Sequence, residues 1–145
     1  MYTLPCARMP TLETLLNRAR FLHLTFIITV VLIPLLGEWF GPVDRADIAG
    51  VQVWLLAGAL AALSVLMFSR QRLLLPAAER LRRSVADPAA QQGWLFACML
   101  TFALAESVVV VGFALRLLGG SLLDSLPLYA AGFLALLMLT PRLAR

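Results

Sequence analysis

Residues 94–118 read WLFACMLTFALAESVVVVGFALRLL, and this stretch decides the fold class. As a helix with a rise of 1.5 Å per residue, it is long enough to cross the roughly 30 Å hydrocarbon core of a bilayer. Glu106 lies at its midpoint, with 12 residues on either side. A charged side chain at the centre of a membrane costs about 2.5–3.5 kcal/mol on insertion scales. Glu106 therefore needs a structural or a functional reason to be there.

Three further apolar stretches have the length of membrane spans, at about residues 21–40, 51–68 and 122–139. Across the chain of 145 residues, 61% are hydrophobic and 14% are charged. Soluble domains carry about 25% charged residues, so this composition excludes most soluble classes. The sequence predicts an all-α integral membrane protein. We expect one domain over residues 1–145, with four transmembrane helices in an antiparallel bundle.

The arginines predict the orientation of this bundle, since the chain has no lysine. Ten of the 12 basic residues lie in the N-terminal tail, in the loop between the second and third spans, and in the C-terminal tail. Only Arg45 and Arg116 lie on the opposite side. By the positive-inside rule, both termini are cytoplasmic, and we expect a bacterial inner membrane. Arginines that face anionic lipid explain the basic pI, and no basic aromatic platform indicates a nucleic-acid partner.

Two short amphipathic helices are predicted outside the spans. Leu12, Leu15 and Leu16 have helical spacing after Thr11, which could be an N-cap. In the loop 69–93, prolines at positions 76 and 88 are expected to break the chain. The segment AAERLRRSVA between them predicts a short basic helix at the lipid headgroups.

Glu106 and its neighbour Ser107 are the candidate proton-binding residues. No residue within one helical turn of Glu106 can neutralise its charge, and burial without a partner favours the protonated carboxyl. Such a group can bind and release a proton, as in proton relays. Equally, a neutral Glu106 can make a structural hydrogen bond across a helix interface. Both interpretations stay open at this point.

Small residues indicate where helices approach closely. Gly58 and Ala62 form a small-xxx-small pair on the second span, and Ala103 and Ser107 form another on the third. Such faces let two backbones come close in a membrane. We therefore expect a contact between the second and third spans, with Glu106 near the seam.

The remaining polar residues predict no catalytic or metal centre. Arg116 is ten residues beyond Glu106, about 15 Å along the helix, so we expect it to reach the outer interface instead of pairing there. His23 is expected to be interfacial, Cys98 to be a buried thiol and Cys6 a thiol of the tail. No second ligand stands at metal-binding spacing, and no nucleophile–base pair or phosphate loop is present, so we expect no enzyme and no cofactor.

Residues 86–120, ADPAAQQGWLFACMLTFALAESVVVVGFALRLLGG, resemble the second half of a rotary ATP synthase c subunit. That family has a cytoplasmic loop with an Arg-Gln-Pro signature, and an ion-binding carboxylate follows the proline by 18 residues. Here Pro88 and Glu106 are 18 residues apart, although Arg-Gln does not precede the proline. The resemblance implies that Glu106 binds a proton or another ion. This chain adds one span on each side of such a hairpin.

The whole chain also resembles a loose group of uncharacterised bacterial four-helix membrane proteins. The similarity lies in the AESxxxxG pattern of the third span, in Gly119–Gly120 and in Pro141–Arg142. Three functions stay open: a c-subunit-like proton-binding protein, an accessory or assembly subunit of a membrane complex, and a small homo-oligomeric transporter. Beyond the lipid bilayer, the expected partners are further copies of the chain or the subunits of a larger complex.

Overall fold

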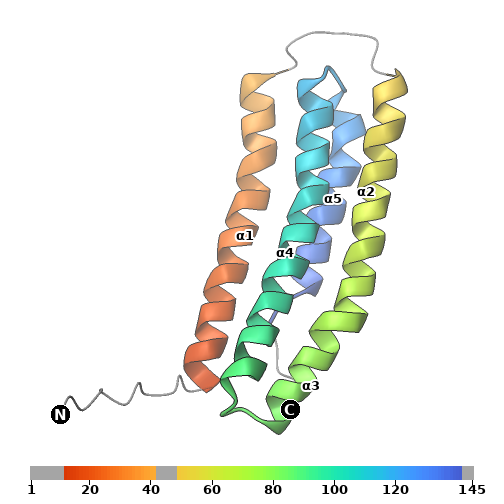
Figure 1. Cartoon of the computed structure of the whole chain (residues 1–145). Coiled ribbons are helices and arrows are strands. Elements are labelled where there is room, and N and C mark those ends of the chain that lie inside the picture. Colours follow the sequence, from red (N-terminus) through yellow and green to blue (C-terminus); the bar gives the residue numbers. More distant parts are fainter. Residues whose placement is uncertain (1–11, 42–48, 142–145) are drawn as a thin grey trace, which may run out of the picture.

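The computed structural model describes residues 12–41 and 49–141, and nearly all of these residues are helical (Figure 1). The described part contains no strand, so the predicted all-α class is confirmed. Predictions for Cys6, Arg8, Thr11, Arg45 and the C-terminal arginines fall outside the described residues. In chain order the elements are α1 (Leu12–Phe40), α2 (Ala49–Ser69), a π-helical segment η1 (Arg70–Leu74), α3 (Leu75–Arg83), α4 (Pro88–Leu117) and α5 (Leu122–Met138).

Three helices are long and apolar enough to cross a membrane, which supports a membrane location. They are α1, the continuous helix Gly50–Arg83 and α4. The fourth expected span corresponds to α5, which is apolar but has only 17 residues. At 1.5 Å per residue, α5 is roughly 25 Å long, slightly less than a typical hydrocarbon core.

The first two spans differ from their predicted bounds. The amphipathic segment expected at the N-terminus is not a separate helix, because α1 runs without a break from Leu12 to Phe40. Of the predicted loop 69–93, only residues 84–87 lie between helices, because η1 and α3 continue α2 and α4 begins at Pro88. The short basic helix predicted within this loop corresponds to α3. Pro76 does not break this continuous helix, and the π-helical segment η1 lies directly before it. A proline inside a helix removes one backbone hydrogen bond, and a local π-helical adjustment can satisfy the freed backbone groups.

The helices are arranged around α4 (Figure 1). α4 packs against α1, α2 and α5, and α1 also contacts α5. α1 and α2 lie on opposite sides of α4 and share no extensive contact within the described residues. The ends at Phe40, Ala49, Leu117 and Leu122 gather at one end of the molecule, which we call the loop end (Figure 1).

Burial follows from this arrangement. α4 contributes the largest share of the core: Trp94, Ala97, Cys98, Thr101, Phe102, Ala105, Val108, Val109, Gly112 and Leu115. α2 buries little, and the exposed faces of α1 and α2 carry large apolar side chains such as Phe21, Trp39, Trp54 and Leu60. An apolar exterior over helices of this length fits a hydrocarbon environment.

A tight turn joins α4 to α5. Gly119 has φ of 102°, a backbone conformation that favours glycine. A side chain at Gly120 would lie 2.7 Å from the carbonyl oxygen of Leu115, so this position also requires glycine. α5 then begins with a capping box between Ser121 and Asp124, which satisfies backbone N–H groups at the helix start. This turn sets the two helices side by side.

Candidate functional site

Glu106 lies on the flank of α4 that faces α1. It follows Phe102 by four residues and precedes Phe113 by seven, so the three side chains share one side of the helix. The ring of Phe102 packs against the rings of His23 and Phe26 of α1, with centroids 5.0 and 5.7 Å apart. The flank that meets α2 carries other residues, Val108 and Leu115 among them. Glu106 is therefore not at the predicted seam between the second and third spans.

The carboxyl of Glu106 is half-buried at the edge of the α1–α4 contact. Phe102 is fully buried, whereas Met99 and Val110, on the outer side of Glu106, are about half exposed. Within the described part of the chain, no hydrogen bond or ion pair reaches this carboxyl. The hydroxyl of Ser107 donates to the carbonyl oxygen of Leu104 at 2.7 Å, so it is bound within its own helix. Glu106 is thus partly buried without a polar partner among the described residues, and Ser107 does not hold it.

Of the predicted packing residues Gly58, Ala62 and Ala103, only Ala62 lies at a contact between helices. Gly58 is exposed, and a Cβ placed there would meet nothing within 4 Å. Its neighbour Ala59 is 1% exposed and packs against α4, while Ala62 is half-buried on the same side. Ala103 is exposed. α2 carries small residues around much of its circumference, and only the tertiary packing selects which of them turns inward.

α4 and α5 approach each other closely at two glycines. A Cβ on Gly132 would lie 2.8 Å from the carbonyl oxygen of Ala105 and would overlap the side chain of Val109. A Cβ on Gly112 would lie 2.9 Å from the ring of Tyr129. Glycines at these two positions let α5 lie directly on α4.

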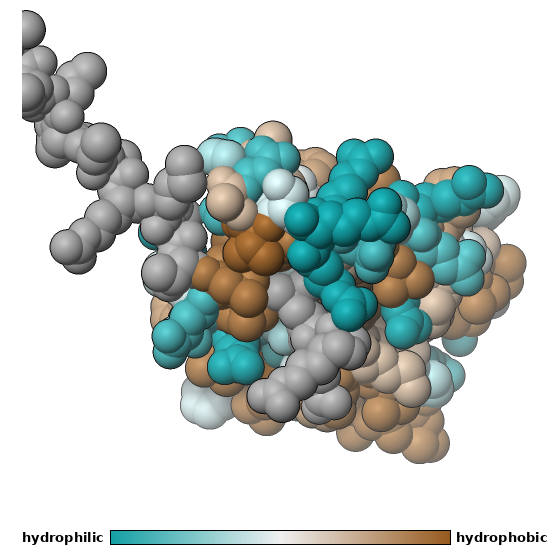
Figure 2. Space-filling model, turned by 90° about the horizontal axis from the view of Figure 1, so that it is seen from below, coloured by the Kyte–Doolittle hydropathy of each residue, from teal (hydrophilic) through white to brown (hydrophobic). Residues whose placement is uncertain are grey.

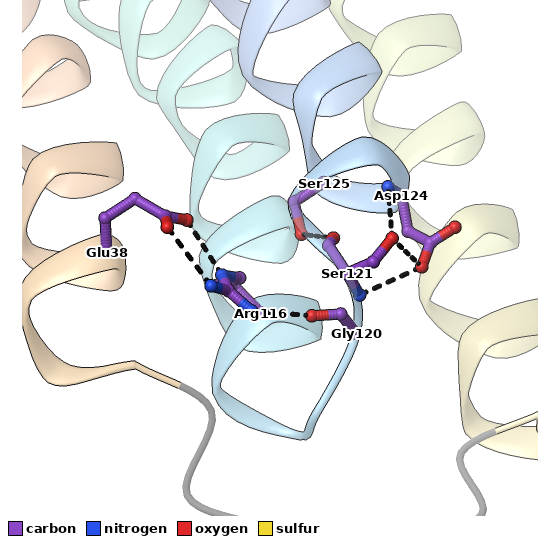
Figure 3. A network of polar contacts seen from close by, with 6 residues as sticks. All are labelled: Glu38, Arg116, Gly120, Ser121, Asp124 and Ser125. Atoms are coloured by element: carbon purple, nitrogen blue, oxygen red, sulfur yellow. Dashed lines mark hydrogen bonds and ion pairs between the residues drawn. The ribbon is translucent and has the colours of Figure 1, made fainter. Parts of the chain in front are cut away.

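Arg116 and Glu38 form an ion pair that sequence reasoning missed (Figure 3). Nε of Arg116 donates to Oε1 of Glu38 at 2.8 Å, and Nη2 donates to Oε2 at 3.1 Å. Nη1 of Arg116 also donates to the carbonyl oxygen of Gly120 at 3.0 Å. The pair joins α1 to α4 and holds the turn before α5. The two residues are 78 positions apart. Glu38 and Arg116 both lie near the outer ends of predicted spans, and this shared position could have indicated the ion pair from sequence.

The neighbouring capping box completes a polar network at the loop end (Figure 3). Oγ of Ser121 donates to Oδ2 of Asp124 at 2.6 Å, and the backbone N–H of Ser121 donates to the same oxygen at 2.9 Å. The hydroxyl of Ser125 donates to the carbonyl oxygen of Ser121 at 3.3 Å. Every contact in this network fixes a helix end, so its role is structural.

His23 is buried between the helices, and its expected position at the membrane interface stays a prediction. Its Nε2 lies 2.9 Å from the carbonyl oxygen of Leu136 in α5. Because a carbonyl oxygen only accepts, Nε2 carries the hydrogen in this contact. His23 thereby links α1 to α5 with a buried hydrogen bond.

Tyr129 places a second polar group in the interior, near the loop end. Its hydroxyl is buried and has no hydrogen-bond partner within the described residues. The hydroxyl oxygen lies 3.2 Å from the position that a Cβ on Gly37 would take. The oxygen therefore sits where α1, α4 and α5 meet.

Glu106 remains the one described carboxyl in the middle of a span, and its neighbours provide no metal site. No group of three or more His, Cys, Asp or Glu side chains within residues 12–41 and 49–141 could hold a metal ion. The arrangement can bind and release a proton at Glu106, and it can offer this carboxyl to a neighbouring chain. Comparison with protein families, curated proteins and solved structures gives no match for this chain.

Proposed function

We propose that this chain is a bacterial inner-membrane protein with four antiparallel transmembrane helices and cytoplasmic termini, and that Glu106 is its proton-binding carboxyl. The observation that carries the proposal is the position of Glu106. Its carboxyl lies in the middle of α4, half-buried, without a hydrogen bond or an ion pair in the described part of the chain. The charge-paired acidic residues within residues 12–41 and 49–141, Glu38 and Glu79, lie near the ends of helices.

An unpaired carboxyl in apolar surroundings is most stable when it carries its proton. No arginine or hydroxyl in the described residues holds Glu106 in one charge state. Protonation can therefore follow a change in the surroundings of the helix, such as a water path or a cation brought by a partner. Met99 and Val110 beside it are about half exposed, which supports access to this carboxyl from outside the molecule.

The proposal is tested by labelling with a hydrophobic carbodiimide, which reacts with protonated carboxyls in lipid. We expect the purified chain in vesicles to be modified at Glu106 near neutral pH, and we expect Glu106→Gln to lose that modification. Glu79→Gln is the matched control, because Glu79 is an exposed carboxyl of α3 that already pairs with Arg82 and Arg83. It should leave the labelling of Glu106 unchanged. Labelling at Glu79 with none at Glu106 would refute a lipid-accessible, protonated Glu106.

A second candidate function is that of a subunit in a larger membrane assembly. One observation favours it: Ala57, Gly58 and Ala61 form an exposed face of small residues on α2, with open space at Gly58. Faces of this kind suit close helix packing in membranes. A neighbouring helix there would come from another copy of the chain or from another subunit.

Native mass spectrometry from mild detergent tests this second function. We expect complexes larger than the monomer, and we expect Gly58→Leu to reduce them because the larger side chain blocks close packing. Val53→Leu is a matched control, since Val53 on the same helix is already large and exposed. A wild-type chain that is purely monomeric in several mild detergents would contradict the subunit role.

A further inference from the structure

A groove lies between α3 and the first turns of α4, at the end of the molecule opposite the loop end. Its volume is about 610 Å³. Arginines from η1 and α3 line it, namely Arg72, Arg80 and Arg83. Figure 2 views this end and shows hydrophilic residues directly beside hydrophobic ones. The groove therefore combines positive charge with an apolar wall.

The arginines that line the groove can bind an anion. The guanidinium of Arg80 has no hydrogen bond or ion pair in the part of the chain that the structure describes. Arg72 lies over the ring of Phe68, with its Cζ 5.7 Å from the ring centroid. Arg83 shares Glu79 with Arg82. The arginines that line the groove are thus not neutralised one for one.

One carboxylate, that of Asp87, also lines the groove, and it already caps the start of α4. Asp87 accepts a hydrogen bond from the backbone N–H of Ala89 at 2.9 Å and so caps α4. Three guanidinium groups line the groove, Asp87 is the one carboxylate among its lining residues, and Glu79 pairs with Arg83, so the groove keeps a net positive charge. Guanidinium groups bind phosphate oxygens with paired hydrogen bonds, which makes a phosphate group the best-matched anion.

The apolar residues of the groove indicate that its ligand also has an apolar part. Leu73 and Phe96 line the groove and are 43% and 66% exposed. Both lie on helices that are apolar enough to span a membrane, at the end where the arginines gather. A soluble phosphate would use only the arginines, whereas a phospholipid uses both parts of the surface.

We propose that this groove binds an anionic phospholipid, with Arg72, Arg80 and Arg83 around its phosphate and one acyl chain along Leu73 and Phe96. The proposal requires a membrane location and does not depend on the role of Glu106. The lipid would hold the cytoplasmic ends of α3 and α4 together. It would also add an anionic group to the side of the bundle where the arginines predict the cytoplasm.

The test is native mass spectrometry of the full chain in detergent, titrated with phosphatidylglycerol, phosphatidylcholine or inorganic phosphate. Each arginine near an anionic lipid contributes about fivefold to affinity, so Arg72→Gln/Arg80→Gln should weaken phosphatidylglycerol binding roughly 30-fold. Arg82→Gln is the matched control, because Arg82 lies on α3 but does not line the groove. We expect it to change the affinity no more than about twofold. Phosphatidylcholine should bind weakly to every variant.

A second variant removes the apolar wall and leaves the charges in place. Phe96→Ala should weaken phosphatidylglycerol binding and leave any weak phosphate binding unchanged, and the exposed position of Phe96 makes a folding defect easy to exclude by circular dichroism. Three results would overturn the proposal. In the first, the double variant and Phe96→Ala both bind phosphatidylglycerol like the wild type. In the second, Arg82→Gln loses as much affinity as the double variant. In the third, inorganic phosphate displaces the lipid at equal concentration.

Discussion

Gly132 provides a sharp test of how α4 and α5 fit together. The substitution Gly132→Ala adds a single methyl group at the closest contact of the two helices. That methyl would overlap the side chain of Val109 and lie 2.8 Å from the carbonyl oxygen of Ala105. A side chain can rotate away, but a backbone carbonyl in a helix cannot move alone. The two helices must separate, or α5 must shift along α4.

The expected magnitude follows from comparing this site with an open one. Forcing an extra methyl into a packed interior costs about 1–3 kcal/mol. At Gly58, where a Cβ would meet nothing within 4 Å, the same Gly→Ala change removes only the flexibility of glycine. An alanine in an open helical position is favoured by about 0.5–1 kcal/mol. The two variants should therefore differ by about 1.5–4 kcal/mol, with opposite signs.

The assay is reversible unfolding of the purified chain in mixed micelles or bicelles, with helix content and tryptophan fluorescence as readouts. Gly93→Ala is a second control, because Gly93 lies on α4 itself and a Cβ added there would meet nothing within 4 Å. Gly132→Ala should unfold first, and Gly58→Ala and Gly93→Ala should match or exceed the wild type. If Gly132→Ala is as stable as Gly58→Ala, the close contact between α4 and α5 is refuted.

Two further predictions concern the polar links of α1. His23→Phe keeps an aromatic ring beside Phe102 but removes the donor to the carbonyl oxygen of Leu136, so we expect a loss of about 0.5–1.5 kcal/mol in the same unfolding assay. Stability equal to the wild type would show that the hydrogen bond contributes nothing. For the ion pair, Glu38→Arg and Arg116→Glu should each lower the melting temperature, and the double reversal should recover part of it. A double variant no better than either single variant would disprove the pairing.

The helical class and the α4–α5 hairpin were predictable from sequence because apolar blocks of span length have few other solutions. The predicted spans 94–118 and 122–139 overlap α4 (Pro88–Leu117) and α5 (Leu122–Met138) closely. α4 begins earlier than its apolar block. Asp87 caps it and Pro88 follows directly, so local capping decides the start and hydrophobicity does not.

The inward faces of the helices were not predictable in the same way. Glu106 was expected near the second span, but the structure places it on the side of α1. When a helix is apolar around its whole circumference, periodicity carries little information about which side meets which neighbour. The partner of Arg116 was missed for a related reason, because it lies on a helix that is distant in sequence. The proton-binding role of Glu106 stays a prediction.

The central place of α4 has a consequence for the order in which this protein is made. α1 and α2 leave the ribosome first, yet both pack chiefly on α4, which is synthesised later. Until α4 is synthesised, the inward faces of α1 and α2 lack their main partner, because these two helices share no extensive contact in the described residues. The hydrogen bond of His23 can form only later, because its acceptor, the carbonyl oxygen of Leu136, lies in α5. The tertiary contacts of α1 and α2 can therefore be completed only late in synthesis, once α4 and α5 are both present.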